Sequence, residues 1–273
     1  MSQRSDAAIK VTLGFSVDTL LPKARGGGQL KMGISKLSEA EWLHPQPDLA
    51  ARAQGFADFP EGVQITLEAE HPGQELAAML GVEGGLPEAA ASAHEDMCLL
   101  TQSGDDEHYR LIGAAVAWPT DWGPKSKIGL PLRALHAPIA GYEEQLASPV
   151  DHFMAKLKPG AIYGRCNWFI APTRAMRWVQ GKDAADDFAH VTPDNAGETL
   201  FVRSERQTLR RLPQTGAILF TIGVYVEPLG SLAPANIAML AQSVQHLVQG
   251  EGERRGAPAY AQKLIDFAAA SAA

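Results

Sequence analysis

Residues 203–211, with the sequence Arg-Ser-Glu-Arg-Gln-Thr-Leu-Arg-Arg, place four arginines and one glutamate between two strand-like stretches. Residues 198–202 and 216–226 on either side are rich in β-branched and aromatic side chains, which favour strands. Proline and glycine in 212–216 predict a turn, so the two stretches should pair as a hairpin. Burying an uncompensated charge costs on the order of several kcal/mol. The charged side of this hairpin must therefore face solvent or hold an anionic or polar ligand.

The size and charge of the chain limit its class. Its 273 residues are 45% hydrophobic, which is enough to bury one sizeable core. The formal net charge of −7 argues against nucleic acid and favours small molecules or other proteins as partners. The sequence has no run of about 18 apolar residues, and residues 1–8 lack the apolar segment of a secretory signal. We therefore expect a cytoplasmic protein that does not use a membrane.

Cysteine usage excludes several cofactors. Cys98 and Cys166 are the only cysteines, so the chain cannot ligate an iron–sulfur cluster or a Cys₄ zinc ion by itself. Each is expected to be a small buried hydrophobic residue. The sequence also has no G-x-G-x-x-G dinucleotide loop. Any redox chemistry on this chain must import its electrons.

The order of predicted elements indicates the fold. The glycines at 26–28 predict a flexible N-terminal arm over 1–28, followed by a single domain over 29–273. Beyond the arginine-rich hairpin, strands are predicted at 63–69, 97–100, 109–118 and 162–170. Helices are predicted at 38–43, 75–80, 150–157, 233–248 and 257–270. Ser38 with Glu41, and Ser148 with Pro149, supply helix-start signals.

These elements predict an α+β fold. Two strands, a helical or irregular segment and three further strands would form an antiparallel sheet, in the element order of a PAS domain. We predict a PAS-like antiparallel sheet with flanking helices and a C-terminal helical extension.

Three further segments complete a recognisable set. They are Trp-Pro-Thr-Asp-Trp at 118–122 with lysines at 125 and 127, Leu-His-Ala-Pro-Ile-Ala-Gly-Tyr at 135–142, and Arg-Cys-Asn-Trp at 165–168. Together with 205–213, they resemble the α-subunit family of haem-dependent oxidative N-demethylases over residues 32–247. The chain departs from the family pattern at Ala140, where proline is usual, and at His152, where arginine is usual.

The resemblance implies a function. Family members are similar to haem-binding PAS sensors that became enzymes, and they oxidise a methylated amine such as dimethylamine with dioxygen, releasing formaldehyde. It implies haem b on this chain, with flavin and a 2Fe–2S centre on a partner reductase subunit. It also allows a folate-binding subunit.

The resemblance implies that His136 ligates the haem iron. One alternative is that His136 is an ordinary loop histidine that hydrogen-bonds the backbone and ligates nothing. Another is that His152, which lies beside the apolar stripe of its predicted helix, is the iron ligand. The other six histidines carry no motif and are expected at the surface or in caps: His44, His71, His94, His108, His190 and His246.

Strand alternation sorts the polar residues, because successive side chains point to opposite faces. Arg165 shares a face of its strand with Tyr163, while Glu205 and Arg206 lie on opposite faces of theirs. A carboxylate suits a protonated amine and a permanently charged donor suits dioxygen, so we assign Glu205 to the amine and Arg165 to the oxygen. The two would form a buried ion pair before substrate binds; a purely structural salt bridge is the alternative.

Other groups are expected around the haem. Four cations are expected to meet the propionates or else solvent: Arg206, Arg210, Arg133 and Lys127. Three tryptophans could wall a haem pocket or pack in an ordinary core: Trp118, Trp122 and Trp168. Tyr109 and Tyr142 could donate a hydrogen bond on the substrate side.

Two other classes of function remain open. A haem gas or redox sensor would keep the iron ligand without an amine-binding carboxylate, and would be fused to an output domain. A non-catalytic subunit of an amine oxidase complex would bind no haem and stay colourless.

Overall fold

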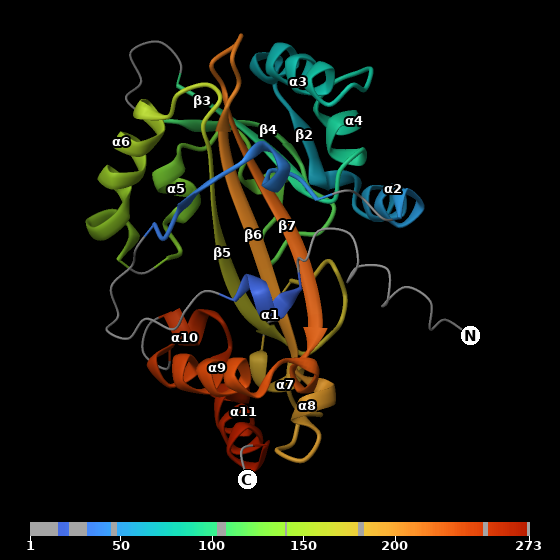
Figure 1. The fold of residues 1–273 in the computed structure, drawn as a ribbon, viewed down its shortest axis with the longest axis vertical. Coiled ribbons are helices and arrows are strands. Elements are labelled where there is room, and N and C mark those ends of the chain that lie inside the picture. Colours follow the sequence, from blue (N-terminus) through green and yellow to red (C-terminus); the bar gives the residue numbers. More distant parts are fainter. Residues whose placement is uncertain are drawn as a thin grey trace. The chain divides into compact units, whose positions relative to one another are not determined.

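A computed structural model describes residues 16–21, 32–44, 48–102, 108–139, 141–179, 183–247 and 251–271 (Figure 1). The described residues form two compact units. The larger comprises those within Leu30–Arg165 and Arg206–Gly223, and the smaller those within Gly14–Gln29, Cys166–Glu205 and Val224–Ala273. Three strands contribute residues to both units, so this division does not test the prediction of a single domain over 29–273.

The predicted α+β class is confirmed. Seven strands form one sheet in the order β1-β5-β6-β7-β3-β4-β2 among the described residues. Their bounds are β1 Ser35–Leu37, β2 Val63–Ile65, β3 Asp96–Thr101, β4 Arg110–Ala115, β5 Ile162–Ala171, β6 Phe201–Arg211 and β7 Ile218–Pro228. The pairings of β1 with β5, β2 with β4, and β3 with β4 and β7 are antiparallel.

Helices occupy much of the remaining described chain. Their bounds are α1 Val17–Leu20, α2 Leu49–Ala57, α3 Leu67–Met79, α4 Leu86–Ala91, α5 Leu132–His136, α6 Ser148–Lys156, α7 Ala184–Asp187, α8 Ala196–Thr199, α9 Pro234–Leu247, α10 Glu251–Arg254 and α11 Ala257–Ser271. No helix among these residues is long and apolar enough to cross a membrane.

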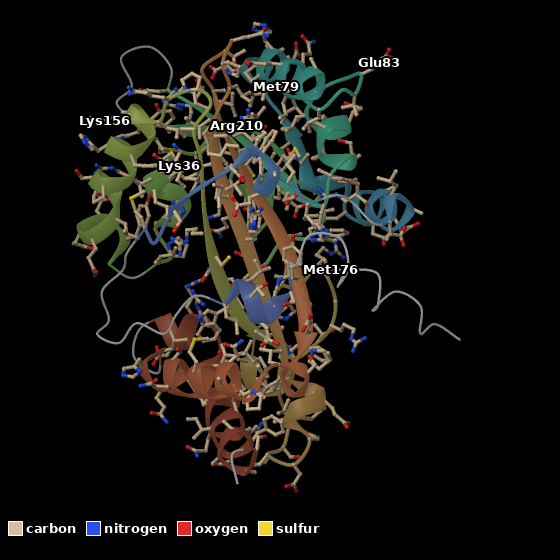
Figure 2. The ribbon with its side chains drawn as sticks, in the orientation of Figure 1. Lys36, Met79, Glu83, Lys156, Met176 and Arg210 are labelled. Atoms are coloured by element: carbon tan, nitrogen blue, oxygen red, sulfur yellow. The ribbon has the colours of Figure 1, made fainter. Side chains whose placement is uncertain are left out.

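The two faces of the sheet in the larger unit carry different helices (Figure 1). Met97 and Leu99 of β3 pack with α3 and α4, whereas Leu100 packs with α6. Lys156 at the end of α6 and Met79 at the end of α3 lie on opposite sides of the strands (Figure 2). Strand alternation therefore sorts the side chains into two cores, as the two-residue period requires.

Helices α3 and α4 pack closely against the β3–β4 hairpin, and a glycine in β4 makes this possible. The predicted pairing is confirmed, with Leu99 opposite Gly113. A Cβ at Gly113 would lie 2.9 Å from the Ala69 side chain and 3.1 Å from that of Leu86. Glycine is therefore needed because α3 and α4 approach the strand too closely for any side chain.

Several predicted element boundaries were wrong, and three of them are informative. The strand predicted at 63–69 ends at Ile65, because Thr66 bonds the Ile112 carbonyl and α3 begins at Leu67. Glu198 lies in α8 rather than in the arginine-rich strand. Ser148 does not cap α6, since a π-helical turn at Glu143–Ala147 runs directly into that helix. Local helical hydrogen bonds overrode the strand and cap signals at these three places.

The smaller unit has its own apolar core. Leu240 and Val244 of α9 pack there with Leu264 of α11, and both helices match their predictions. Asp18, in the described part of the predicted N-terminal arm, accepts hydrogen bonds from the Ala233 amide at 3.0 Å and from the Asn236 side chain at 2.6 Å. The carboxylate thus satisfies donors at the start of α9, where the helix dipole favours negative charge.

Arg211 joins three segments of the larger unit. Its guanidinium donates to the carbonyls of Leu157 and Met154 at the end of α6, each at 2.6 Å. It also donates to the Gly216 carbonyl at 2.6 Å and to the Tyr109 hydroxyl at 2.9 Å. One cation therefore satisfies the open carbonyls of a helix end and closes the β6–β7 turn.

Replacing Arg211 with alanine should destabilise the protein, because it leaves these carbonyls without their donor. We expect the free energy of unfolding in urea to fall by about 2–4 kcal/mol with an unchanged slope. Lys125→Ala serves as the control and should change stability by less than about 0.5 kcal/mol, since Lys125 pairs with Glu61 in solvent. Equal effects of the two substitutions would contradict this role of Arg211.

Candidate functional site

The predicted ligand His136 lies at the end of the short helix α5, above the sheet face that carries α6. Leu132 is buried in the core beneath α5, and Leu135 packs against the apolar side chains around Trp122 and Phe220. These two leucines fasten the helix to the sheet. His136, next in sequence to Leu135, is then held half-buried rather than in solvent.

Two contacts orient the His136 imidazole. Nδ1 lies 2.9 Å from the Leu132 carbonyl, and the ring stacks on Tyr142 with centroids 4.4 Å apart and planes 11° apart. A carbonyl can only accept, so Nδ1 carries the proton and Nε2 holds a lone pair. Nε2 has no hydrogen-bond partner among the described residues.

The environment keeps this imidazole neutral. Burial holds the pKa of His136 below its ordinary value, and the positive charges of Lys127 and Arg165 lower it further. The Leu132 hydrogen bond opposes these effects without reversing them. A neutral imidazole with a defined tautomer is the form that ligates iron.

A tight turn brings Tyr142 back onto His136. The Ile139 amide donates to the His136 carbonyl at 2.9 Å, and the Tyr142 amide donates to the Ile139 carbonyl at 3.1 Å. Gly141 has φ = 78°, a left-handed conformation that explains glycine at this position. The departure at Ala140 lies outside the described residues. The described residues of the predicted motif therefore place Tyr142 back against the histidine.

Lys127 and Arg165 complete what we call the α5 cluster, with His136 and Tyr142. Lys127 donates to the Leu135 carbonyl at 3.4 Å. Arg165 lies on β5 two residues after Tyr163, which packs on the α5–α6 side of the sheet. Alternation places Arg165 on that same face, and its charge acts on His136 accordingly. The prediction that Arg165 shares a face with Tyr163 thus agrees with the electrostatics.

Glu205 lies in the part of β6 that belongs to the smaller unit, and its side chain is buried. Alternation puts it on the same face of β6 as Leu209, which packs in the α5–α6 core. Arg165 belongs to the larger unit. The predicted ion pair between Arg165 and Glu205 therefore stays a prediction.

Arg206, Arg210 and Arg133 were predicted, with Lys127, to meet the haem propionates. Each of these three arginines instead contacts an acceptor within the protein. Arg206 donates to the carbonyls of Trp42, at 2.9 Å, and Glu41. Arg210, labelled in Figure 2, pairs with Glu39 at 2.5 Å and covers the Trp42 ring at 4.2 Å. On the α5 side of the sheet, Arg133 pairs with Glu143 at 2.5 Å and lies 3.5 Å from Asp151. Of the four predicted cations, Lys127 is the one whose charge acts on His136.

The alternative iron ligand and the predicted pocket tryptophans lie in different parts of the protein. His152 is exposed on α6, beside the apolar residues Phe153 and Met154. Trp122 packs near Leu135, whereas Trp118 covers Arg52 on the other side of the sheet and Trp168 packs in the smaller unit. Trp122 and Trp168 thus pack in different apolar cores, and Trp118 instead lies against an arginine.

A second buried polar group escaped prediction. Glu95, just before β3, is fully buried; its Oε1 accepts from the His44 amide at 2.8 Å and lies 3.8 Å from Arg206. Its Oε2 has no hydrogen-bond partner among the described residues. Burial raises the pKa of Glu95 to about 7, against the opposing effects of the His44 amide, Arg206 and Arg52. The sequence offered one signal for this group. His, Glu and Asp stand together at 94–96, directly before the predicted strand at 97–100.

The expectation that all six histidines without a motif lie at the surface or in caps was wrong for two of them, which lie beside Glu95. His44 and His94, predicted at the surface or in caps, are buried, with ring centroids 5.3 Å apart. Burial and the charge of Arg206 lower the pKa of His44. No motif marked either residue because their burial results from segments distant in sequence, which meet when the His94 amide bonds the His44 carbonyl.

Glu95 should make stability depend on pH. Its pKa is higher in the folded than in the unfolded protein, so its favourable contribution is present below pH 4.5 and is lost as pH rises to about 7. Relative to Glu95→Gln, the wild type should lose on the order of 3 kcal/mol of unfolding free energy over this range. Urea unfolding of both proteins from pH 4.5 to 8 measures the difference, and a constant difference would contradict the raised pKa.

A family comparison adds to this geometry. Among the described residues, no three His, Cys, Asp or Glu side chains are placed to bind a metal ion together. Haem iron needs only one or two protein ligands, so that observation does not bear on it. A sequence model of the family described as "Haem-dependent oxidative N-demethylase, alpha subunit-like" matches residues 66–265, which include the whole α5 cluster. This chain belongs to the haem-dependent oxidative N-demethylase, alpha subunit-like family.

Proposed function

We propose that this chain, through haem b, catalyses oxidative N-demethylation of a small secondary amine such as dimethylamine. The amine, dioxygen, two electrons and two protons give the shorter amine, formaldehyde and water. The electrons come from a partner carrying flavin and a 2Fe–2S centre, because this chain's two cysteines cannot hold a cluster. The alpha-subunit family description itself implies partner subunits. The antiparallel sheet and the flanking helices support the PAS-like description.

The observation that carries the proposal is the state of His136. Its Nδ1 proton is given to the Leu132 carbonyl, its Nε2 lone pair is left available, and its pKa is lowered. Metal-ligating histidines in proteins commonly show this arrangement, in which the second ring nitrogen donates to a carbonyl. These features support a site that would hold haem, with His136 supplying a nitrogen ligand to its iron.

The protein's own groups then have distinct tasks. When bound, haem supplies the oxidation of the amine's methyl group. Glu205 holds the protonated amine, and Arg165 presents a permanent donor that polarises dioxygen. Lys127 offers a charge for a haem propionate. The half-buried setting of His136 keeps its ring neutral at the site.

Removing the ligand should change the colour of the protein. We expect His136→Ala to lose the wild-type Soret spectrum and to retain haem at least roughly tenfold less well, because the substitution removes the proposed imidazole ligand of the iron. Absorption spectra of the purified and haem-reconstituted proteins measure this. His152→Ala is the matched control, since that exposed histidine should leave the spectrum unchanged. Wild-type ligation in His136→Ala, with loss in His152→Ala, would reverse the assignment.

Amine binding should depend on Glu205. Titration of the haem-loaded protein with dimethylamine should shift the spectrum, and Glu205→Gln should weaken the apparent affinity roughly 10–100-fold through loss of a charge-assisted bond. Glu227→Gln, on the neighbouring strand β7, should bind the amine as the wild type does. A haem spectrum that does not respond to amines in the wild type would instead favour a haem sensor.

A further inference from the structure

The stack of Tyr142 on His136 is specific in its geometry. The rings are 4.4 Å apart and within 11° of parallel, as in an offset stack. Tyr142 is buried, with 5% of its side chain exposed. In the part of the chain that the structure describes, its hydroxyl has no hydrogen-bond partner. The contact with His136 is therefore made by the ring of Tyr142 and not by its hydroxyl.

The two contacts of His136 restrict different motions. The Leu132 carbonyl determines which edge of the imidazole faces the helix, because Nδ1 must point at it. A single hydrogen bond still allows the ring to tilt about that axis. Tyr142 removes the tilt, because a rotated imidazole would lose the parallel contact or collide with the phenol ring.

The loop that carries Tyr142 is built to hold it there. The Tyr142 amide bonds the Ile139 carbonyl, and Gly141 takes the left-handed conformation that reverses the chain. After Tyr142, the Gln145 amide bonds the Gly141 carbonyl at 3.1 Å, and a π-helical turn leads into α6. Backbone bonds on both sides of Tyr142 thus fix the position of the backbone that carries its ring.

We propose that Tyr142 is a positioning residue that sets the plane of the His136 imidazole and so directs its Nε2 lone pair toward the iron. This role rests on the proposed function, because it concerns the ligand of that same site. It also differs from the role of hydrogen-bond donor to the substrate side, which would require the hydroxyl. The two roles make opposite predictions for Tyr142→Phe.

The test compares Tyr142→Phe with Tyr142→Leu. In the haem-free protein, the ring protons of His136 should be shifted upfield by the stacked phenol in NMR spectra. We expect Tyr142→Phe to keep this shift and Tyr142→Leu to abolish it. In the haem-loaded protein, Tyr142→Leu should broaden or displace the iron–imidazole stretching band in resonance Raman spectra and weaken haem binding roughly threefold to tenfold. Tyr142→Phe should match the wild type in both.

Phe153→Leu is the control for loss of an aromatic ring on the same side of the sheet. Phe153 packs edge-on against Tyr163 at 5.2 Å and is not stacked on His136. Its substitution should leave the His136 signals and the iron–imidazole band unchanged. If it perturbs them as strongly as Tyr142→Leu does, general packing explains the effect and the positioning role is wrong.

The remaining outcomes separate this inference from the proposed function. If His136→Ala leaves iron ligation unchanged, the ligand assignment fails and the positioning role fails with it. If His136 ligates iron but Tyr142→Leu keeps the wild-type band and affinity, the positioning role alone is overturned. If Tyr142→Phe behaves like Tyr142→Leu, the hydroxyl is the important group and the inference is again overturned.

Discussion

Two arginines on β6, the buried Arg206 and the half-buried Arg211, are the constraint on which much of the larger unit depends. Their charges cannot leave water without acceptors, since an unpaired buried charge costs on the order of several kcal/mol. Backbone carbonyls supply most of these acceptors: Glu41 and Trp42 for Arg206, and the end of α6 for Arg211. Hydrogen bonds from these two arginines thereby attach the chain at 41–42, on one face of the sheet, and the end of α6, on the other face, to the central strand β6.

The charges on the α5 side of the sheet are arranged differently. Arg206 and Arg210 satisfy their charges on the face opposite α5, mainly with the chain at 39–42 and with Glu95. On the α5 face, Lys127 and Arg165 instead bring positive charge to a neutral histidine. An excess of cations beside an imidazole suits an anionic cofactor, as haem with its propionates would be. The two faces of the same sheet therefore hold their positive charges in different surroundings.

Period-two patterns allowed much of the sheet to be predicted. The β3–β4 hairpin and β5, β6 and β7 follow from runs of β-branched and aromatic residues bounded by turn residues. The boundary errors at Thr66 and Glu198 arose where a strand-like composition lies next to a helix start. Short-range propensity could not decide there, because most of the stability of a helix in a protein comes from packing rather than from the propensity of its own residues.

The sequence by itself determined the residue types, the alternation that separates Glu205 from Arg206, and the motif containing His136. Only the tertiary structure decided which charges meet: Glu95 lies beside Arg206 although 111 positions separate them, as their numbers show. It also decided the tautomer of His136 and the stack of Tyr142, because a ring contact depends on a backbone turn that residue types only permit. Alternation is a property of one strand, whereas burial and electrostatics arise from segments that fold together.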